Sequence, residues 1–201
     1  PLGEGIVSTT WTIVPPTGSA VATSSSSPTW SDFNPDLAGT YEATLNIVTA
    51  DGRTGSCTTS LDVVPTHDLW IELFWANAGD DLDLHLVKPG YGVADVTTDA
   101  DCYYSNCVDY GWGSLDWGVV GDTTDDPALE LDDIPGVGPE VISLGSPTSG
   151  TYSIFVHDYP GSVYSGSNLA TVNVWVNGAL EWTDSVDITT EDAYTAFAQV
   201  S

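Results

Sequence analysis

The sequence predicts an all-β protein made of two tandem β-sandwich domains, of the immunoglobulin-like or jelly-roll-like kind. The charged residues are the first indication, because Asp outnumbers Glu by 22 to 7 while Lys and Arg together number two. Helix surfaces normally carry Glu and Lys instead. Thr, Ser, Gly, Pro and Val, which are typical of strands and turns, are abundant. Several segments also alternate apolar and polar residues with a period of two, which indicates half-buried strands.

The charge balance limits the partners that the chain can bind. Its formal net charge is −27, whereas nucleic acids and anionic membrane surfaces are bound by basic patches. No apolar run approaches the roughly 18 residues that a membrane-spanning helix needs. We therefore expect no nucleic-acid partner and no membrane insertion.

The first domain is expected over residues 1–65. Residues 6–14 are rich in Thr, Val and Ile and form a strand that stops at Pro15, and a Ser/Thr/Pro-rich loop follows over 17–29. A second strand alternates from Tyr41 to Ile47. After a hairpin turn at Asp51-Gly52, residues 57–64 return as a third strand.

The order of motifs in this domain carries a resemblance. Residues 35–41 (PDLAGTY), the Leu45-x-Ile47 pair, the Asp51-Gly52 turn and a last strand ending at Pro65 resemble the second half of a PKD-type domain. The resemblance implies an immunoglobulin-like sandwich of a bacterial surface or secreted protein, with Trp11 at the place of a core tryptophan. A complete PKD-type domain has further strands before that tryptophan.

Two interpretations of the missing strands follow. In one, the strands belong to a longer parent protein, and Cys57 pairs with a cysteine in that segment. In the other, a neighbouring chain, such as a second copy of this one, adds a strand to the open edge. Either interpretation leaves Cys57 without a partner in this sequence.

The second domain is expected over residues 66–201. Its clearest strand is 80–87, where Leu82, Leu84 and Leu86 face one side while Asp81, Asp83 and His85 share the other. Further strands are expected at 68–76, 140–144, 150–158, 170–177 and 193–200. Between them, residues 91–139 form an acidic insert too long for an ordinary connection, and long loops in compact domains are usually functional.

Motifs of the second domain carry a second resemblance. They are Asp81-x-Asp83-Leu84-His85 with Pro89-Gly90, the Gly136-x-Gly138-Pro139-Glu140 segment, and Gly150-Thr151-Tyr152 leading to His157-x-Tyr159. In this order they are similar to the YfaP-like domain of unknown function and, distantly, to the pre-peptidase C-terminal β-sandwich. The resemblance implies an exported bacterial β-sandwich without established chemistry. The Gly-Thr-Tyr motifs at 39–41 and 150–152 are explained by the tyrosine corner of sandwich folds.

The concentration of carboxylates predicts calcium. Residues 80–140 hold 13 of the 22 Asp, and such a cluster repels itself unless a cation lies among its members. Calcium takes six to eight oxygen ligands from carboxylates, carbonyls and water. The alternative is that the acidity only provides solubility, as on a halophilic surface. The candidate ligands are Asp81, Asp83, Asp99, Asp101, Asp122, Asp125, Asp126, Asp132, Asp133 and Glu140.

Cysteine, aromatic and histidine residues complete the candidates. Cys102 and Cys107 enclose four residues and are expected to form a disulfide. Tyr104, Trp112 and Trp117 lie in the acidic insert and are possible glycan contacts, or else a small core beneath the loop. The three histidines are scattered and no HExxH or GxSxG motif is present, so we expect surface or core histidines and no enzyme.

Taken together, the sequence predicts a non-catalytic, calcium-stabilised structural or adhesion module that is secreted or held at the cell surface. Its expected partners are other extracellular proteins, including copies of itself. The alternative is a calcium-dependent carbohydrate-binding module that uses the aromatic residues of the insert.

Overall fold

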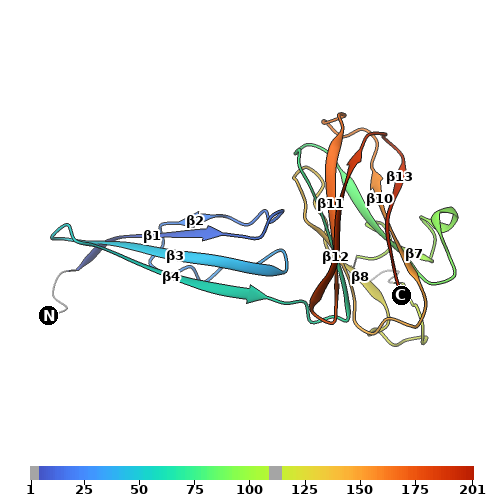
Figure 1. The fold of residues 1–201 in the computed structure, drawn as a ribbon, viewed down its shortest axis with the longest axis horizontal. Helices are drawn as coiled ribbons and strands as arrows, with labels where there is room; N and C mark the ends of the chain where they lie inside the picture. Colours follow the sequence, from blue (N-terminus) through green and yellow to red (C-terminus); the bar gives the residue numbers. More distant parts are fainter. Residues whose placement is uncertain (1–4, 109–114) are drawn as a thin grey trace. The chain divides into compact units, whose positions relative to one another are not determined.

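The computed structural model describes residues 5–108 and 115–201. The chain divides into two compact units, the first ending at Val64 and the second running from Pro65 to Ser201. The regular structure of the described residues is almost entirely antiparallel strand, with one 3-10 turn, η1 (Val93–Asp95) (Figure 1). The predicted all-β class is therefore confirmed. None of the helical structure in these residues has the length and hydropathy of a membrane span.

The described part of the first unit holds one sheet, with the strand order β2-β1-β3-β4. Its strands are β1 (Ile6–Val14), β2 (Ser24–Ser25), β3 (Gly39–Thr49) and β4 (Thr54–Val63). The short β2 pairs with Trp11 and Thr12 only, so residues 6–10 of β1 have no partner strand on that side among the described residues. β4 forms the other edge of this sheet.

A tyrosine corner closes the start of β3. The Tyr41 hydroxyl donates to the carbonyl of Leu37 (2.9 Å) and accepts from its N–H (3.1 Å). Tyr152 makes the related contact in the second unit, where its hydroxyl donates to the carbonyl of Thr148 (3.2 Å). The expectation that both Gly-Thr-Tyr motifs form tyrosine corners is confirmed.

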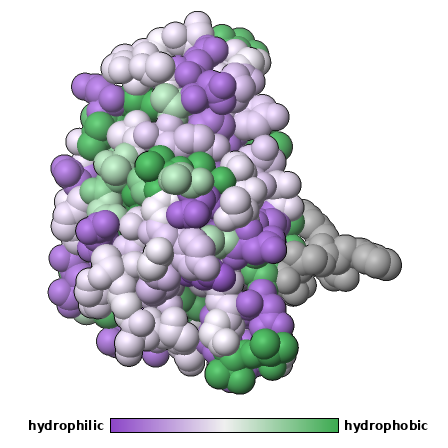
Figure 2. All heavy atoms as spheres, turned by 90° about the vertical axis from the view of Figure 1, so that its right-hand side faces the viewer, coloured by the Kyte–Doolittle hydropathy of each residue, from purple (hydrophilic) through white to green (hydrophobic). Residues whose placement is uncertain are grey.

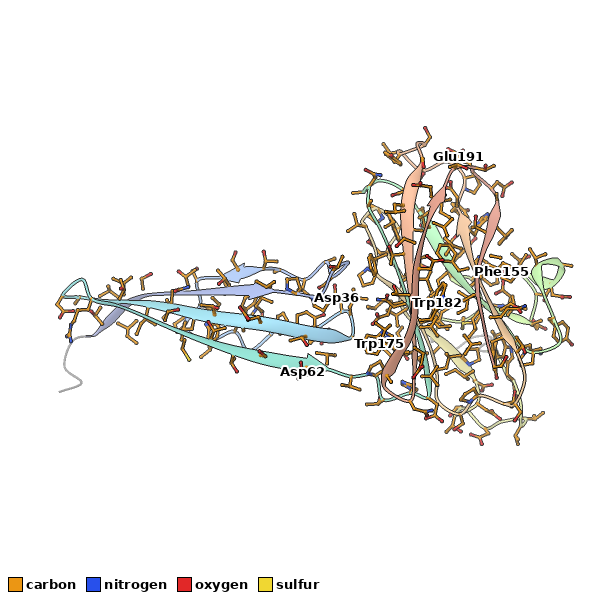
Figure 3. The ribbon with its side chains drawn as sticks, viewed as in Figure 1. Asp36, Asp62, Phe155, Trp175, Trp182 and Glu191 are labelled. Carbon is orange, nitrogen blue, oxygen red and sulfur yellow. A yellow bond between two sulfur atoms is a disulfide. The ribbon has the colours of Figure 1, made fainter. Side chains whose placement is uncertain are left out.

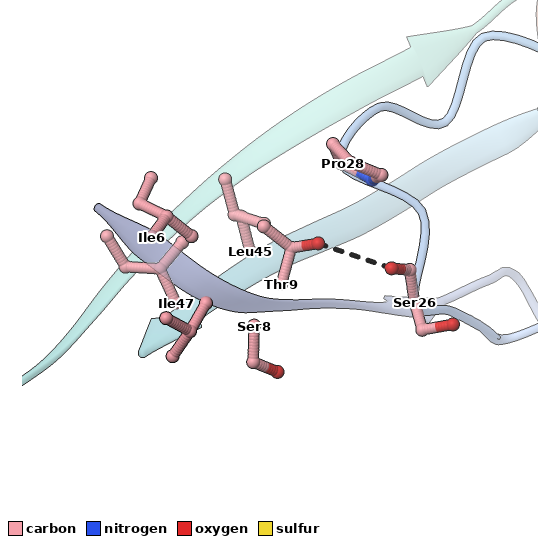
Figure 4. A pocket seen from close by; sticks show the side chains of 8 residues that line it. Ile6, Ser8, Thr9, Ser26, Pro28, Leu45 and Ile47 are labelled. Atoms are coloured by element: carbon pink, nitrogen blue, oxygen red, sulfur yellow. Dashed lines mark hydrogen bonds between the residues drawn. The ribbon is translucent and has the colours of Figure 1, made fainter. Parts of the chain in front are cut away.

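An open groove runs along the end of the first sheet that lies far from this corner. Figure 4 shows Ile6, Leu45, Ile47 and Pro28 around it, with the Thr9 hydroxyl donating to a carbonyl of the neighbouring loop (3.2 Å). Ile6 is 57% exposed. Apolar side chains on this face are thus only partly covered by the described chain.

The second unit contains two antiparallel sheets. One has the order β13-β10-β6-β7 and the other β12-β11-β5-β9-β8. The strands are β5 (Leu69–Trp75), β6 (Leu82–Val87), β7 (Asp101–Cys102), β8 (Pro127–Leu131), β9 (Glu140–Leu144), β10 (Tyr152–Asp158), β11 (Asn168–Val176), β12 (Ala179–Ile188) and β13 (Tyr194–Val200).

The hydrophobic core of this unit is built by alternate residues of both sheets. Leu82, Leu84 and Leu86 of β6 are fully buried in the same core cluster as Ile71 and Ile142 of the other sheet. Figure 3 shows side chains filling the unit, including Trp182 of β12, which packs against this core. The unit therefore has the two-layer architecture of a sandwich.

The acidic insert is tied to the sandwich at several points. Cys102 and Cys107 form a disulfide, as predicted, with their Cα atoms 5.0 Å apart. Both cysteines belong to the core cluster. The Leu129 N–H donates to the carbonyl of Cys107 (2.8 Å), which links the disulfide loop to β8. The start and the end of the insert are thereby held against the same core.

Candidate metal centre

The alternation of β6 places its polar residues away from the core. Asp83 and His85 lie on the other face of the β13-β10-β6-β7 sheet from the three leucines, and His157 of β10 stands directly opposite Asp83. These three side chains are nevertheless buried, with residue exposures of 3%, 0% and 6%. Burial of three ionisable groups side by side is costly unless each finds a partner.

The Gly-x-Gly-Pro-Glu segment delivers a further carboxylate to this region. The Asp133 carboxylate accepts from the Gly136 N–H (3.2 Å) and the Gly138 N–H (2.8 Å), which folds the segment around it. Gly138 has φ +85, and a Cβ there would lie 2.9 Å from the carbonyl oxygen of Leu73. Only glycine fits this position. Glu140 follows as the first residue of β9.

Three carboxylates from two segments meet at this point, since Asp81 and Asp83 lie in one stretch at the start of β6 and Glu140 lies in β9. One oxygen each of Asp81, Asp83 and Glu140 lies within 4.8 Å of the other two. Calcium–oxygen bonds are 2.3–2.6 Å long, so two ligands on opposite sides of one ion are about 4.6–5.2 Å apart. The three oxygens are therefore spaced so that a single calcium ion could contact all of them.

The hydrogen bonding of this cluster is incomplete. Glu140 Oε2 accepts from the Leu84 N–H (2.6 Å), whereas Glu140 Oε1 is buried without a hydrogen-bond partner. Asp81 Oδ1 is also buried without one. A buried carboxylate oxygen without a donor costs several kcal/mol in general, unless a proton or a cation takes that place. We call Asp81, Asp83 and Glu140 the carboxylate cluster.

The electrostatics of the cluster match this geometry. Burial, followed by the charges of Asp83 and Asp132, raises the pKa of Asp81 to about 7. Burial also raises the pKa of Asp83, and burial followed by the charge of Asp83 raises the pKa of Glu140 well above its usual value. At neutral pH the cluster thus competes for protons, which is the behaviour of a site that lacks positive charge.

A second group shares Asp83. One ligand atom each of Asp83, His85 and His157 also lies within 4.8 Å of the other two. His157 Nδ1 is 3.3 Å from Asp83 Oδ2, and the His157 ring stacks on Tyr194. Burial lowers the pKa of His157, but hydrogen bonding and charge from Asp83 and Asp192 together outweigh burial and raise it overall.

The remaining predicted ligands fall into two sets. Asp132 and Asp133 lie near the cluster, since the charges of both raise the pKa of Asp81. The other five make hydrogen bonds away from the cluster. Three carboxylates accept backbone N–H groups: Asp122 from Thr124 (3.0 Å), Asp125 from Val119 (2.8 Å) and Asp126 from Trp117 (2.5 Å). The Asp101 carboxylate pairs with His85 (2.6 Å), and the backbone carbonyl of Asp99 accepts from the Trp117 indole (2.9 Å).

The carboxylates of Asp122, Asp125 and Asp126 act as acceptors that close loops of the insert. In the described residues, neither Asp99 and Asp101 nor Asp122, Asp125 and Asp126 form a group like the carboxylate cluster. Asp125 Oδ1 is buried without a hydrogen-bond partner, but Asp125 belongs to no group of three ligand side chains among the described residues. The predicted ligands thus divide in two: Asp81, Asp83, Asp132, Asp133 and Glu140 lie at or near the carboxylate cluster, and the other five lie away from it.

The aromatic residues expected as glycan contacts are packed within the second unit where the structure describes them. Trp117 is 4% exposed and belongs to the core cluster, so it presents no ring face to a sugar. Tyr104 packs edge-on against Tyr103 and Tyr159. Trp112 lies outside the residues that the structure describes. Trp117 is therefore a core residue, and its assignment as a glycan contact is wrong.

The surface over this side of the second unit is mixed. Figure 2 shows hydrophilic residues interspersed with separate hydrophobic patches on the face that carries β13 and β10. On this face the hydrophobic residues do not form one continuous apolar area.

Comparison with known proteins adds no relative. No family model, no curated protein and no solved structure matches the chain.

Proposed function

We propose that this protein is a non-catalytic, calcium-stabilised structural or adhesion module of an exported protein. The single observation that carries the proposal is the carboxylate cluster with its two buried oxygens that lack donors. One calcium ion held by Asp81, Asp83 and Glu140 replaces their mutual repulsion with shared coordination. Asp132 supplies further negative charge close by.

The position of the cluster explains how binding stabilises the fold. Asp83 belongs to β6 of one sheet and Glu140 to β9 of the other. An ion between them links the two layers and fixes the end of the acidic insert. The disulfide fixes its beginning. Disulfides persist in oxidising compartments, which supports a secreted or cell-surface location.

Equilibrium dialysis of the metal-stripped chain against calcium tests the proposal. The expected result is one saturable site that Glu140→Gln removes and Asp122→Asn leaves intact. Asp122 is the matched control because it is an acidic residue of the insert whose oxygen accepts from the Thr124 N–H and hydroxyl. Calcium binding that is non-saturable, or equal in the two variants, contradicts the proposal.

A second role, self-association by strand addition, is supported by the open edge of β4. The Thr49 N–H donates to the carbonyl of Arg53 (2.9 Å). Continuing that register, odd-numbered residues of β4 bond to β3 and the N–H groups of even-numbered residues point outward. An outward row of N–H groups is a template for a strand from a second copy.

Light scattering tests this second role. We expect concentration-dependent association that Ser60→Pro abolishes, because proline removes one outward N–H. Ser60→Ala, which keeps that N–H, should associate like the original chain. A monomer at all concentrations, or association that survives Ser60→Pro, contradicts strand addition at this edge.

A further inference from the structure

The grouping of two histidines with Asp83 has chemistry that calcium does not use. Calcium prefers oxygen ligands, whereas His85 and His157 offer imidazole nitrogen. Two imidazoles with one carboxylate suit zinc and other transition metals. We propose that Asp83, His85 and His157 form a second metal site, for a divalent transition ion of the zinc class, adjacent to the carboxylate cluster.

The hydrogen bonds of His85 support this assignment. Its Nδ1 shares a 2.6 Å hydrogen bond with Asp101 Oδ2, and both side chains are fully buried. Its Nε2 is buried and has no hydrogen-bond partner. An imidazole whose one nitrogen is held by a carboxylate while the other is open has the arrangement of a metal-binding histidine.

His157 shows the same arrangement with the nitrogens exchanged. Its Nε2 lies 3.4 Å from Asp192 Oδ1, on the solvent side, while its Nδ1 faces Asp83 at 3.3 Å. Each histidine is therefore oriented by a carboxylate outside the group, Asp101 for His85 and Asp192 for His157. Such outer carboxylates fix the ring orientation of metal ligands and increase their basicity.

The spacing of the inner atoms fits tetrahedral coordination. With metal–ligand bonds of about 2.0–2.1 Å, two ligands of a tetrahedron are about 3.3 Å apart. Asp83 Oδ2 and His157 Nδ1 are separated by 3.3 Å, which is long for a hydrogen bond between a charged pair but natural for two ligands of one ion. Three protein ligands leave a fourth position for water.

The ring packing keeps this group rigid. His85 stacks on Tyr103 with ring centroids 5.2 Å apart, and His157 stacks on Tyr194 at 4.4 Å. The two imidazoles meet edge to face at 5.9 Å. Rings that are held in this way lose little side-chain entropy when a metal binds.

Cobalt(II) is the probe for this site, because its visible absorption reports nitrogen and oxygen coordination in place of zinc. The metal-stripped full chain should take up one equivalent of cobalt with new visible bands, and zinc should displace it. His85→Gln and His157→Gln should each weaken cobalt binding about tenfold or more, and Asp101→Asn about 10- to 100-fold.

His67→Gln is the matched control, since His67 is the third histidine and lies outside the group. It should bind cobalt like the original chain. Absence of visible bands in the original chain, or equal losses in His67→Gln and His157→Gln, overturns the proposal. The first of these outcomes needs no variant and so is independent of folding defects.

Two further variants separate this site from the calcium site. Glu140→Gln should lose calcium binding and keep the cobalt bands, whereas His157→Gln should keep calcium binding, which also shows that it folds. Asp83→Asn should lose both, because Asp83 belongs to both groups. Loss of the cobalt bands in Glu140→Gln would contradict a distinct second site, while calcium results alone decide the proposed function.

Discussion

Two fully buried glutamates of the second unit have opposite surroundings. Glu72 of β5 accepts from three donors: the Trp70 indole (3.1 Å), the Asn173 amide (3.1 Å) and the Trp175 indole (2.9 Å). Glu140 accepts one backbone N–H, has an oxygen without a donor, and lies among further carboxylates. Figure 3 marks Trp175, one of the donors to Glu72.

The difference teaches that burial of a carboxylate does not by itself indicate a metal. Around Glu72 the protein supplies the hydrogen bonds that replace water, so the charge is stabilised within the fold. Around Glu140 the protein supplies more negative charge instead, so burial and the charge of Asp83 raise the pKa of Glu140. The candidate calcium site is therefore located by asking whether each carboxylate oxygen has a hydrogen-bond donor, and not by counting acidic residues.

The largest expected effect concerns calcium and Glu140. At a hundredfold excess of calcium over its dissociation constant, the original chain should gain about 2.7 kcal/mol of stability. Glu140→Gln should gain nothing, while Asp125→Asn should gain as much as the original chain. Urea denaturation with and without calcium measures this gain. An equal gain in both variants would contradict a calcium site at Glu140.

Glu72→Gln should behave in the opposite way. An amide offers one acceptor oxygen to donors that now use both carboxylate oxygens, so at least one donor loses its acceptor. We expect a loss of about 2 kcal/mol that calcium does not alter. A loss that calcium restores in the same denaturation experiment would show that Glu72 and the cluster are coupled.

Asp133 should matter through the loop that it folds. Asp133→Ala removes the acceptor of the Gly136 and Gly138 N–H groups and should cost about 1–2 kcal/mol in the metal-free protein. Asp133→Asn retains one acceptor oxygen, so its loss should be smaller. Thermal denaturation of both variants checks this order, and equal losses would mean that charge rather than hydrogen bonding is responsible.

The pH dependence of the metal-free protein should also reveal the cluster. The folded-state pKa of Asp81 is raised to about 7, so the native state holds a proton that the unfolded chain releases near pH 4. Stability should therefore fall as pH rises from about 4 to about 7, by about 1 kcal/mol, since solvent reaching the partly exposed Asp81 screens the effect.

The raised pKa of His157 acts in the same direction, because stability from its protonated form is lost as pH rises through that pKa. Denaturation in a chelator at several pH values measures the slope. Saturating calcium should flatten it, because the ion requires the ionised carboxylates. If stability instead rises over this pH range in the chelator, the carboxylates of the cluster do not have raised pKa values in the folded state.

The smallest effect is expected in the insert. Asp122 is an exposed loop acceptor for Thr124, so Asp122→Ala should lower the melting temperature only slightly, and equally with and without calcium. Thermal denaturation checks it. A large, calcium-dependent loss would place a second calcium site in the insert, as the sequence allowed.

Much of the fold could be predicted from local patterns. The strand of residues 6–14 follows from its Thr, Val and Ile content, and the parity of β6, with leucines inward and Asp83 and His85 outward, follows from strong alternation. β8 and the two-residue β7 were not predicted, because both lie within the acidic insert, where short segments without clear alternation pair with the neighbouring strands β9 and β6. The first unit was expected to be an incomplete sandwich, and its described residues form one sheet.

The candidate site was predicted only in part, for a physical reason. Composition singled out ten carboxylates but could not separate those that close loops from those that meet across two sheets. The histidines were interpreted individually, since His85 and His157 are 72 positions apart in the sequence. Their meeting depends on the pairing of β6 with β10, which places His157 opposite Asp83. The motif Asp83-Leu84-His85 together with a strand-end His157 was the available signal.

The most direct test of the central claim is a thermal melt of the metal-stripped chain, titrated with calcium at fixed high ionic strength. The account predicts a saturable rise of several degrees that neither sodium nor magnesium reproduces. A melting temperature that follows ionic strength alone would contradict it, because screening of a solvated acidic surface would then explain the stability without a bound ion.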